Sequence, residues 1–259
     1  MATRYPIILV HGIMLKDIWK FKAFGRIENV MKDEGNEVFT STHDGLGSIE
    51  NNAEQIKIFI DDVLVRTNSK KVNIVAHSKG GLDVLYMIDK LDVTDKIASV
   101  TFLSTPHKGS VIAEKLYGMP NLIKHFLAFW LNFWYRIFGD KKPDALTVCK
   151  QLKLSENGAV VLSENHRKIF MQSYSSTLEK SRDDFVMGIP LYFTKKFTNL
   201  PSDGMVSVES SKIGEYKGNC TNISLSHSEM VDVLAKKKKK DKIYGFYKQL
   251  CKDLEDSNY

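Results

Sequence analysis

The chain has 259 residues, of which 43% are hydrophobic and 26% are charged, and its formal net charge is +6. This composition is typical of a globular protein and excludes collagen-like and proline-rich disordered classes. The 3 cysteines cannot form a disulfide framework, because at least one must stay free. Part of the positive charge comes from one lysine run at 236–240. Because no basic stripe with interleaved aromatic residues is present, we expect no nucleic-acid partner.

The order of sequence patterns predicts an α/β protein. Continuous apolar runs indicate buried strands, and apolar residues at a period of 3.6 indicate helices. We expect strands over 5–10, 37–41, 72–76, 97–103, 189–197 and 220–225, and helices over 23–32, 49–65, 82–88 and about 229–254. Strands that alternate with helices are typical of a doubly wound, mostly parallel sheet with helices on both faces. No internal repeat or long linker divides the chain, so we expect residues 1–259 to form a single domain.

The N-terminal residues carry no recognisable targeting signal. Met1 to Arg4 lead directly into the first strand, without the charged, apolar and cleavage regions of a signal peptide. We therefore expect either a cytoplasmic protein or the mature form of a secreted one. We also expect no transmembrane segment.

A candidate nucleophile follows the strand over 72–76. This strand leads into His77-Ser78-Lys79-Gly80-Gly81 and then into a helix. The pattern matches the G-x-S-x-G nucleophile elbow, with Ala76 in the first small position. Residues two before and two after the serine must be small, because the turn brings the strand and helix backbones together. We predict that Ser78 is the nucleophile and that His77 points away from it. The alternative is an incidental serine in a strand–helix turn.

A candidate oxyanion hole involves the end of the first strand, where His11, Gly12 and Ile13 follow Val10. The tetrahedral intermediate of acyl transfer needs two backbone N–H donors. We predict that the amides of Ile13 and Lys79 supply them, since such donors come from a loop after an early strand and from the residue after the nucleophile. The alternative is that Gly12 only turns the chain.

A serine nucleophile needs a histidine base, and the histidine needs an orienting carboxylate, in the chain order Ser, acid, His. We predict His227 as the base, because it lies between the last strand-like run and the final helix. Asp203 is the predicted acid, since its Asp-Gly sequence places a carboxylate on a sharp turn after the predicted strand over 189–197. A surface-loop histidine and a plain turn aspartate are the alternatives, and Asp183 and Asp184 compete as the acid.

The segment 122–138 holds 7 of the 27 aromatic residues in the chain. A narrow polar stripe at helical spacing interrupts its broad apolar surface. It is short for a transmembrane helix and carries Lys124 and Arg136. A buried core helix is one interpretation. We favour a lid, whose apolar face covers the active site in water and meets lipid when it opens. The expected helical lid or cap insertion spans about 111–160.

Five stretches carry a family resemblance, in the family's order: 5–12, 71–81, 104–110, 202–206 and 226–229. With them the chain resembles the bacterial triacylglycerol lipases of the Pseudomonas–Burkholderia and Bacillus–Geobacillus kind. The region of about 111–190 matches only loosely. The resemblance implies an α/β-hydrolase fold and ester hydrolysis at a lipid–water interface. It also implies the same nucleophile, acid, base and oxyanion amides as the residues themselves indicate.

The resemblance also implies a structural calcium ion near the loop of the catalytic histidine. Its ligands would be Glu229, where the family usually has aspartate, and an upstream carboxylate, Asp183 or Asp184. Calcium prefers six to eight oxygen ligands, and only two side chains can be named here. The chemistry itself requires no cofactor.

The sequence therefore predicts a serine hydrolase that cleaves carboxylic esters of lipids through an acyl-enzyme. Its expected partners are a lipid or other ester substrate and a transient lipid–water interface. A soluble carboxylesterase or polyester hydrolase without interfacial activation is one alternative. A non-catalytic lipid- or membrane-binding module that uses only the aromatic helix is another.

Overall fold

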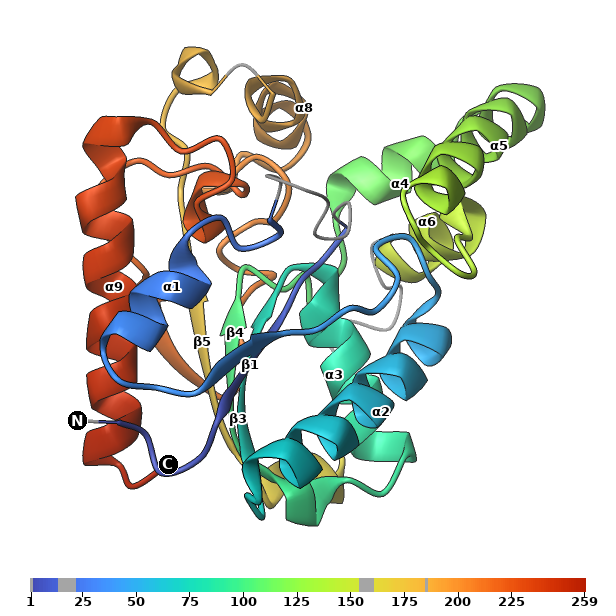
Figure 1. The fold of residues 1–259 in the computed structure, drawn as a ribbon. Coiled ribbons are helices and arrows are strands. Elements are labelled where there is room, and N and C mark those ends of the chain that lie inside the picture. Colours follow the sequence, from blue (N-terminus) through green and yellow to red (C-terminus); the bar gives the residue numbers. More distant parts are fainter. Residues whose placement is uncertain (1, 14–21, 154–160, 185) are drawn as a thin grey trace.

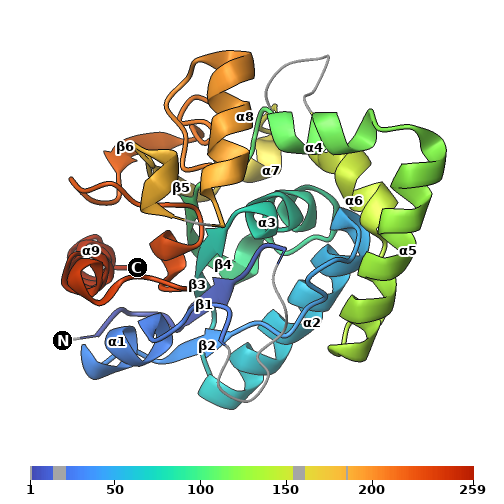
Figure 2. The same ribbon diagram turned by 90° about the horizontal axis from the view of Figure 1, so that it is seen from above.

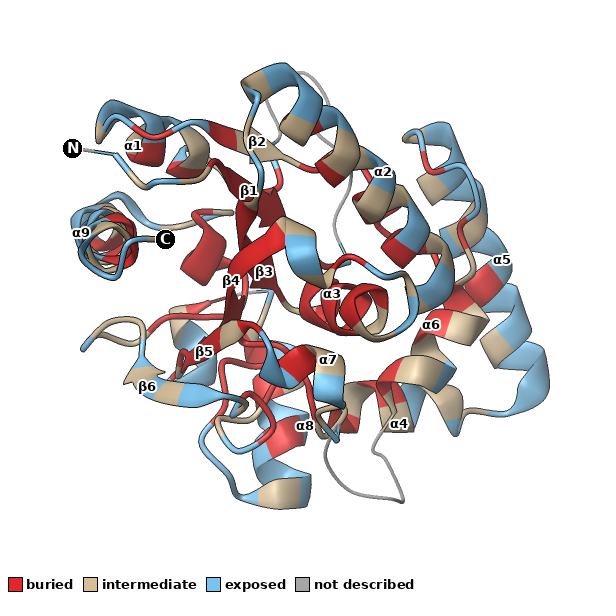
Figure 3. Ribbon diagram, turned by 90° about the horizontal axis from the view of Figure 1, so that it is seen from below, coloured by how far each residue is buried: buried red, intermediate tan, exposed pale blue. Residues whose placement is uncertain are grey.

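The computed structural model describes residues 2–13, 22–153, 161–184 and 186–259. Its centre is a sheet of 6 strands in the order β2-β1-β3-β4-β5-β6, and every neighbouring pair is parallel. The strands are β1 (Ile7–Val10), β2 (Val38–Thr40), β3 (Val72–His77), β4 (Ile97–Leu103), β5 (Phe170–Ser175) and β6 (Glu215–Asn219). Strands β1, β3 and β4 are buried along their whole length, as their apolar runs predict (Figure 3).

Helices cover both faces of the sheet (Figures 1 and 2). On one face α1 (Ile27–Asp33) packs against α9 (Lys237–Asp256), and on the other α2 (Ile49–Thr67) packs against α3 (Lys79–Lys90). A short helix, α7 (Glu164–Arg167), contacts α3. The apolar side chains form two buried clusters, one on each face of the sheet. This arrangement confirms the predicted α/β class with helices on both faces.

The remaining helices lie above the carboxyl edge of the sheet, where the strands end (Figure 1). Helices α4 (Val111–Tyr117), α5 (Asn121–Ile137) and α6 (Ala145–Leu152) follow β4 and pack together. Helix α5 projects outward from the body of the molecule (Figure 1). Helix α8 (Gly188–Thr198) lies beside α4. In the described part of the chain, no helix combines the length and the hydropathy needed to cross a bilayer.

Two predicted strands are wrong. The run over 189–197 forms helix α8, and its β-branched and aromatic residues misled the prediction. Pro190 lies in the first turn of this helix, where the fixed φ and missing N–H of proline are compatible with helical geometry. The run over 220–225 is irregular, and the last strand, β6, precedes it.

Two strands, β5 and β6, were not predicted from the sequence, and the start of the final helix was predicted too early. Strand β5 escaped prediction because Gln172, Ser173 and Ser175 interrupt its apolar pattern, although all three are buried. Gln172 donates a hydrogen bond to the Thr101 hydroxyl at 2.9 Å, which satisfies a polar group inside the sheet. The final helix begins only at 237. Three short 3-10 helices complete the described elements: η1 (Thr94–Lys96), η2 (Ser181–Asp183) and η3 (Glu229–Val231).

Candidate active site

Ser78 occupies the turn between β3 and α3. Its backbone has φ 56° and ψ −133°, in a region that residues other than glycine rarely adopt. Glycines surround this turn for steric reasons. A Cβ atom on Gly12 would lie 2.6 Å from the Ser78 Cβ, and one on Gly80 would lie 2.3 Å from the His11 carbonyl oxygen. The sharp turn and the small flanking residues are therefore those that the elbow pattern predicts.

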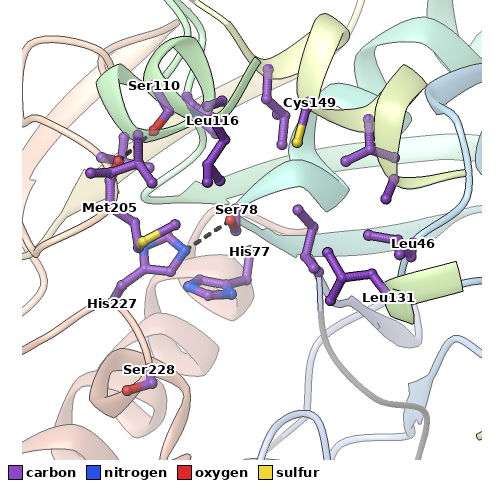
Figure 4. Close-up of a pocket in the computed structure, with 18 of the residues that line it drawn as sticks. Leu46, His77, Ser78, Ser110, Leu116, Leu131, Cys149, Met205, His227 and Ser228 are labelled. Carbon is purple, nitrogen blue, oxygen red and sulfur yellow. Dashed lines mark hydrogen bonds between the residues drawn. The ribbon is translucent and has the colours of Figure 1, made fainter. Parts of the chain in front are cut away.

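The structure brings Ser78, His227 and Asp203 into one hydrogen-bonded chain. The Nε2 atom of His227 lies 2.8 Å from the Ser78 Oγ (Figure 4). Its Nδ1 lies 2.7 Å from an Asp203 carboxylate oxygen. The His227 amide also donates to the Asp203 carbonyl at 3.0 Å. This geometry lets the carboxylate hold the imidazole so that Nε2 can accept the serine proton.

Asp203 is fully buried, and both of its carboxylate oxygens have partners. Its Oδ1 accepts hydrogen bonds from the amides of Met205 and Val206 at 3.0 and 2.8 Å, while its Oδ2 faces His227. Gly204 has φ +111°, which the sharp turn requires. Asp203 is therefore a turn residue, as the alternative interpretation expected, and it also contacts His227, as expected of the catalytic acid. It follows helix α8 rather than a strand.

The other histidines that follow Ser78 in the sequence, and the competing aspartate Asp184, occupy other places. His166 contacts the Leu85 carbonyl, His125 is exposed on α5, and His107 is buried without a hydrogen-bond partner for either ring nitrogen among the described residues. Asp184 binds the Ser226 hydroxyl rather than His227.

His77 lies beside the base His227, contrary to its predicted orientation. We expected it to point away from the site, but its ring lies 4.5 Å from the His227 ring and lines the same cavity (Figure 4). Burial, together with the nearby charge of His227, lowers the pKa of His77 well below its ordinary value. A neutral ring therefore packs beside His227, and no sequence pattern indicated this contact.

The predicted oxyanion residues flank Ser78. Ile13 lines the cavity that contains Ser78, and Gly12 lies so close to Ser78 that its backbone leaves no room for a side chain there. Lys79 is the first residue of α3, so its amide belongs to the helix N-terminal groups that lack an intrahelical acceptor. Both amides thus belong to backbone segments next to the hydroxyl.

A buried ion pair supports the first turn of α3. The Lys79 ammonium contacts the Asp83 carboxylate at 2.7 Å, and the Asn52 amide donates to the same carboxylate at 3.0 Å. Burial raises the pKa of Asp83 to about 6, although the Lys79 charge opposes this shift. Asp83 was not among the predicted site residues, and the only feature of the sequence that indicates its role is the i,i+4 spacing from Lys79.

A mostly apolar cavity of about 290 Å³ opens at Ser78 and His227 (Figure 4). Helices α4, α5 and α6 supply one of its walls. The larger aliphatic side chains of this wall are Ile112, Leu116, Leu131, Val148 and Leu152. The part of the expected cap up to 153 thus borders the site, and its last residues, 154–160, lie outside the described residues.

The aromatic side chains of α5 mostly face away from this cavity. Only Leu131 and Tyr135 of this helix line it, whereas Phe129 is 63% and Trp134 is 49% exposed. The ring of Trp130 packs edge-on against its neighbours on the same exposed surface. The structure thus presents an uncovered aromatic surface beside the cavity mouth rather than a face folded over Ser78.

The expected calcium ligands do not form a cation site. The Glu229 carboxylate binds the Lys239 ammonium at 2.6 Å, and the Asp183 carbonyl accepts a hydrogen bond from Lys236. Across the described residues, no group of three or more His, Cys, Asp or Glu side chains could hold a metal ion.

Comparison with known proteins agrees with the motifs. The family model for lipases of class 2 matches residues 4–97, which include the Gly12 loop and the Ser78 elbow. A triacylglycerol lipase of Vibrio cholerae is 34% identical over 118 residues, which are 45% of this chain and 37% of the relative. The predicted resemblance to bacterial triacylglycerol lipases is confirmed. The aligned part spans only about a third of the length of the curated relatives that match first.

Solved structures share the fold over nearly the whole chain. A Staphylococcus hyicus lipase superposes with a TM-score of 0.68 at 12% identity, covering 97% of this chain and 95% of that one. A mature Bacillus licheniformis lipase superposes with a TM-score of 0.60 at 18% identity, covering 89% and 87%. The chain therefore has the α/β-hydrolase fold of these two solved structures.

Proposed function

We propose that this protein hydrolyses carboxylic esters of lipids through an acyl-enzyme. The observation that carries the proposal is the continuous chain from the Ser78 hydroxyl through His227 to the buried Asp203 carboxylate. The proposal is supported by the position of Ser78 above the carboxyl edge of the sheet, where it lines an apolar cavity that could admit an ester.

The geometry supports a two-step reaction. Ser78 Oγ attacks the ester carbonyl carbon while His227 Nε2 takes its proton, and the amides of Ile13 and Lys79 stabilise the developing oxyanion. The C–O bond to the alcohol then breaks, and the leaving alcohol receives the proton from His227. Water attacks the acyl-enzyme with His227 again as the base, which releases the carboxylic acid and restores Ser78.

The surroundings of the site favour a lipid ester over a polar one. The cavity walls are largely apolar, so an acyl chain can leave water when it binds. The exposed aromatic side chains of α5 lie on the cap formed by α4–α6, at about 111–152. We propose that this cap contacts the lipid surface while the ester enters the cavity.

Replacement of the nucleophile tests the proposal. Ser78→Ala should lower kcat for p-nitrophenyl butyrate by a factor on the order of 10⁴–10⁶, because the attacking oxygen is lost. It should also abolish labelling by a fluorophosphonate. Ser257→Ala, at an exposed position on the distant C-terminal end, is the matched control and should retain both activities. Unchanged turnover in a folded Ser78→Ala protein would contradict the proposal, and an unreactive wild-type protein would favour a non-catalytic lipid-binding role.

A further inference from the structure

The loop that carries His227 is attached to helix α9 by a buried ion pair. Glu229 is 1% exposed, and its Oε2 accepts hydrogen bonds from the Lys239 ammonium at 2.6 Å and from the Ser226 amide at 3.1 Å. Lys239 belongs to the first turn of α9 and is only 8% exposed. One carboxylate therefore links the residues on both sides of His227 to a helix that packs on the sheet.

A second carboxylate holds the same loop from the opposite segment. The Ser226 hydroxyl donates to Asp184 Oδ2 at 2.6 Å, and Asp184 Oδ1 accepts hydrogen bonds from the amides of Val186 and Met187 at 2.8 and 2.9 Å. The loop thus lies between two carboxylates, Asp184 on one side and Glu229 with its Lys239 partner on the other.

Calcium does not fit this arrangement. A calcium ion needs about six to eight oxygen ligands. Here Glu229 already binds an ammonium group, whose positive charge would repel the ion, and the Asp184 oxygens already accept three hydrogen bonds. Among the described residues, no further His, Cys, Asp or Glu side chain joins these two carboxylates to complete a metal site.

We propose that the Lys239 ammonium takes the place of a bound metal cation at this loop. The ammonium neutralises the Glu229 carboxylate and thereby positions His227 against Ser78 without a metal ion. This inference rests on the proposed function of Ser78. Lys239 is a positioning residue, because it contacts Glu229 and not the reacting atoms. A loop tethered in this way keeps Nε2 at its 2.8 Å separation from the serine hydroxyl.

Two variants test the positioning role, with kinetics measured below their unfolding temperatures. Lys239→Met should lower kcat for p-nitrophenyl butyrate by about 10–100-fold with little change in KM, because misplacement of a catalytic group slows chemistry rather than binding. Glu229→Gln removes the same attraction and should show the same loss in kcat. It leaves the Lys239 ammonium, rather than a loop carboxylate, without its partner, and because the Lys239 side chain is 10% exposed against 2% for Glu229, this variant should be the less destabilised of the two. Lys238→Met, at the exposed neighbouring position, is the matched control and should retain wild-type kinetics.

Spectroscopy and calcium titration separate positioning from stability. The low-field proton signal of the His227–Asp203 hydrogen bond should weaken or shift in both variants but not in the control. The unfolding temperature of the wild-type protein should be the same in EDTA and in millimolar calcium chloride.

Retained kcat and proton signal in both variants would overturn the proposal, and so would a rise of the wild-type unfolding temperature in calcium. Absence of ester hydrolysis by the wild-type protein would instead contradict the proposed function, so the two failures are distinguishable.

Discussion

At the scale of single residues, the side chain directly after the nucleophile is a buried lysine rather than a solvent-exposed one. Lys79 is 1% exposed and pairs with Asp83, which is fully buried. Removing one partner of a buried ion pair is costly, because the other charge is then left without a partner in a medium of low polarity. The backbone amide that we assign to the oxyanion hole thus belongs to a residue whose side chain is held in place by the ion pair with Asp83.

Asp83→Asn should therefore destabilise the protein strongly. The substitution leaves the Lys79 ammonium buried without a counter-charge, and we expect the free energy of unfolding to fall by about 3–5 kcal/mol. Urea denaturation near neutral pH measures this change. Asp62→Asn is the matched control, because it breaks an i,i+4 pair with Arg66 that is about half exposed, and it should cost less than about 1 kcal/mol. Equal losses in the two variants would show that the buried pair is not essential.

The residues of the candidate triad could be predicted from the sequence, whereas the residues that hold the triad in place could not. Ser78, Asp203 and His227 stand in motifs whose spacing reflects the chemistry of acyl transfer. Lys239 and Asp83 lie outside such motifs, since their roles depend on which helix packs beside which loop. A lysine run on a final helix looks like a solvated surface, and only the packing of α9 shows that one of its five ammonium groups is buried.

At the scale of elements, secondary structure was predicted correctly where all residues of a segment have the same degree of burial. Strands β1, β3 and β4 are buried on both faces, so their sequences are uniformly apolar. Strand β5 mixes buried polar residues with apolar ones, and α8 carries exposed aromatic residues, so local composition misrepresents both. The helix over 122–138 was expected from its periodicity, but its outward orientation depends on the neighbouring helices α4 and α6.

The exposed surface of α5 should matter for aggregated substrates and not for dissolved ones. Trp130 and Trp134 are 43% and 49% exposed and do not line the cavity. Replacing both with serine should lower the hydrolysis rate of emulsified tributyrin at least about tenfold, because each buried tryptophan contributes on the order of 1.5–3 kcal/mol to interfacial binding. Hydrolysis of dissolved p-nitrophenyl acetate should remain unchanged.

A control for this experiment uses apolar residues elsewhere on the surface. Ile58 and Val65 on α2 are exposed but lie away from the cap, and a double serine variant of these should behave as wild type on both substrates. Parallel loss on emulsion and dissolved ester in the tryptophan variant would mean that α5 serves the cavity itself. The protein would then act as a carboxylesterase without interfacial activation.

At the scale of the whole molecule, stability in acid depends on groups that the fold buries uncharged. His107 follows β4, packs edge-on against Phe102 and has a pKa that burial lowers to about 3. The unfolded chain binds a proton at this residue below about pH 6.5, whereas the folded chain does so only near pH 3. Stability therefore rises with pH across this window and is lost as pH falls through it. His77 is shifted in the same direction.

His107→Gln should accordingly flatten the acid dependence of stability. One such histidine reduces the free energy of unfolding by about 1.4 kcal/mol per pH unit, or about 2 kcal/mol between about pH 6.5 and about pH 5. The variant lacks the titrating ring, so its loss over this interval should be smaller by that amount, whatever its stability at neutral pH. Urea denaturation of both proteins at the two pH values gives the difference in slope directly. Equal slopes would mean that the folded protein accommodates a charged imidazole at position 107, and acid sensitivity would then have to come from His77 and the carboxylates.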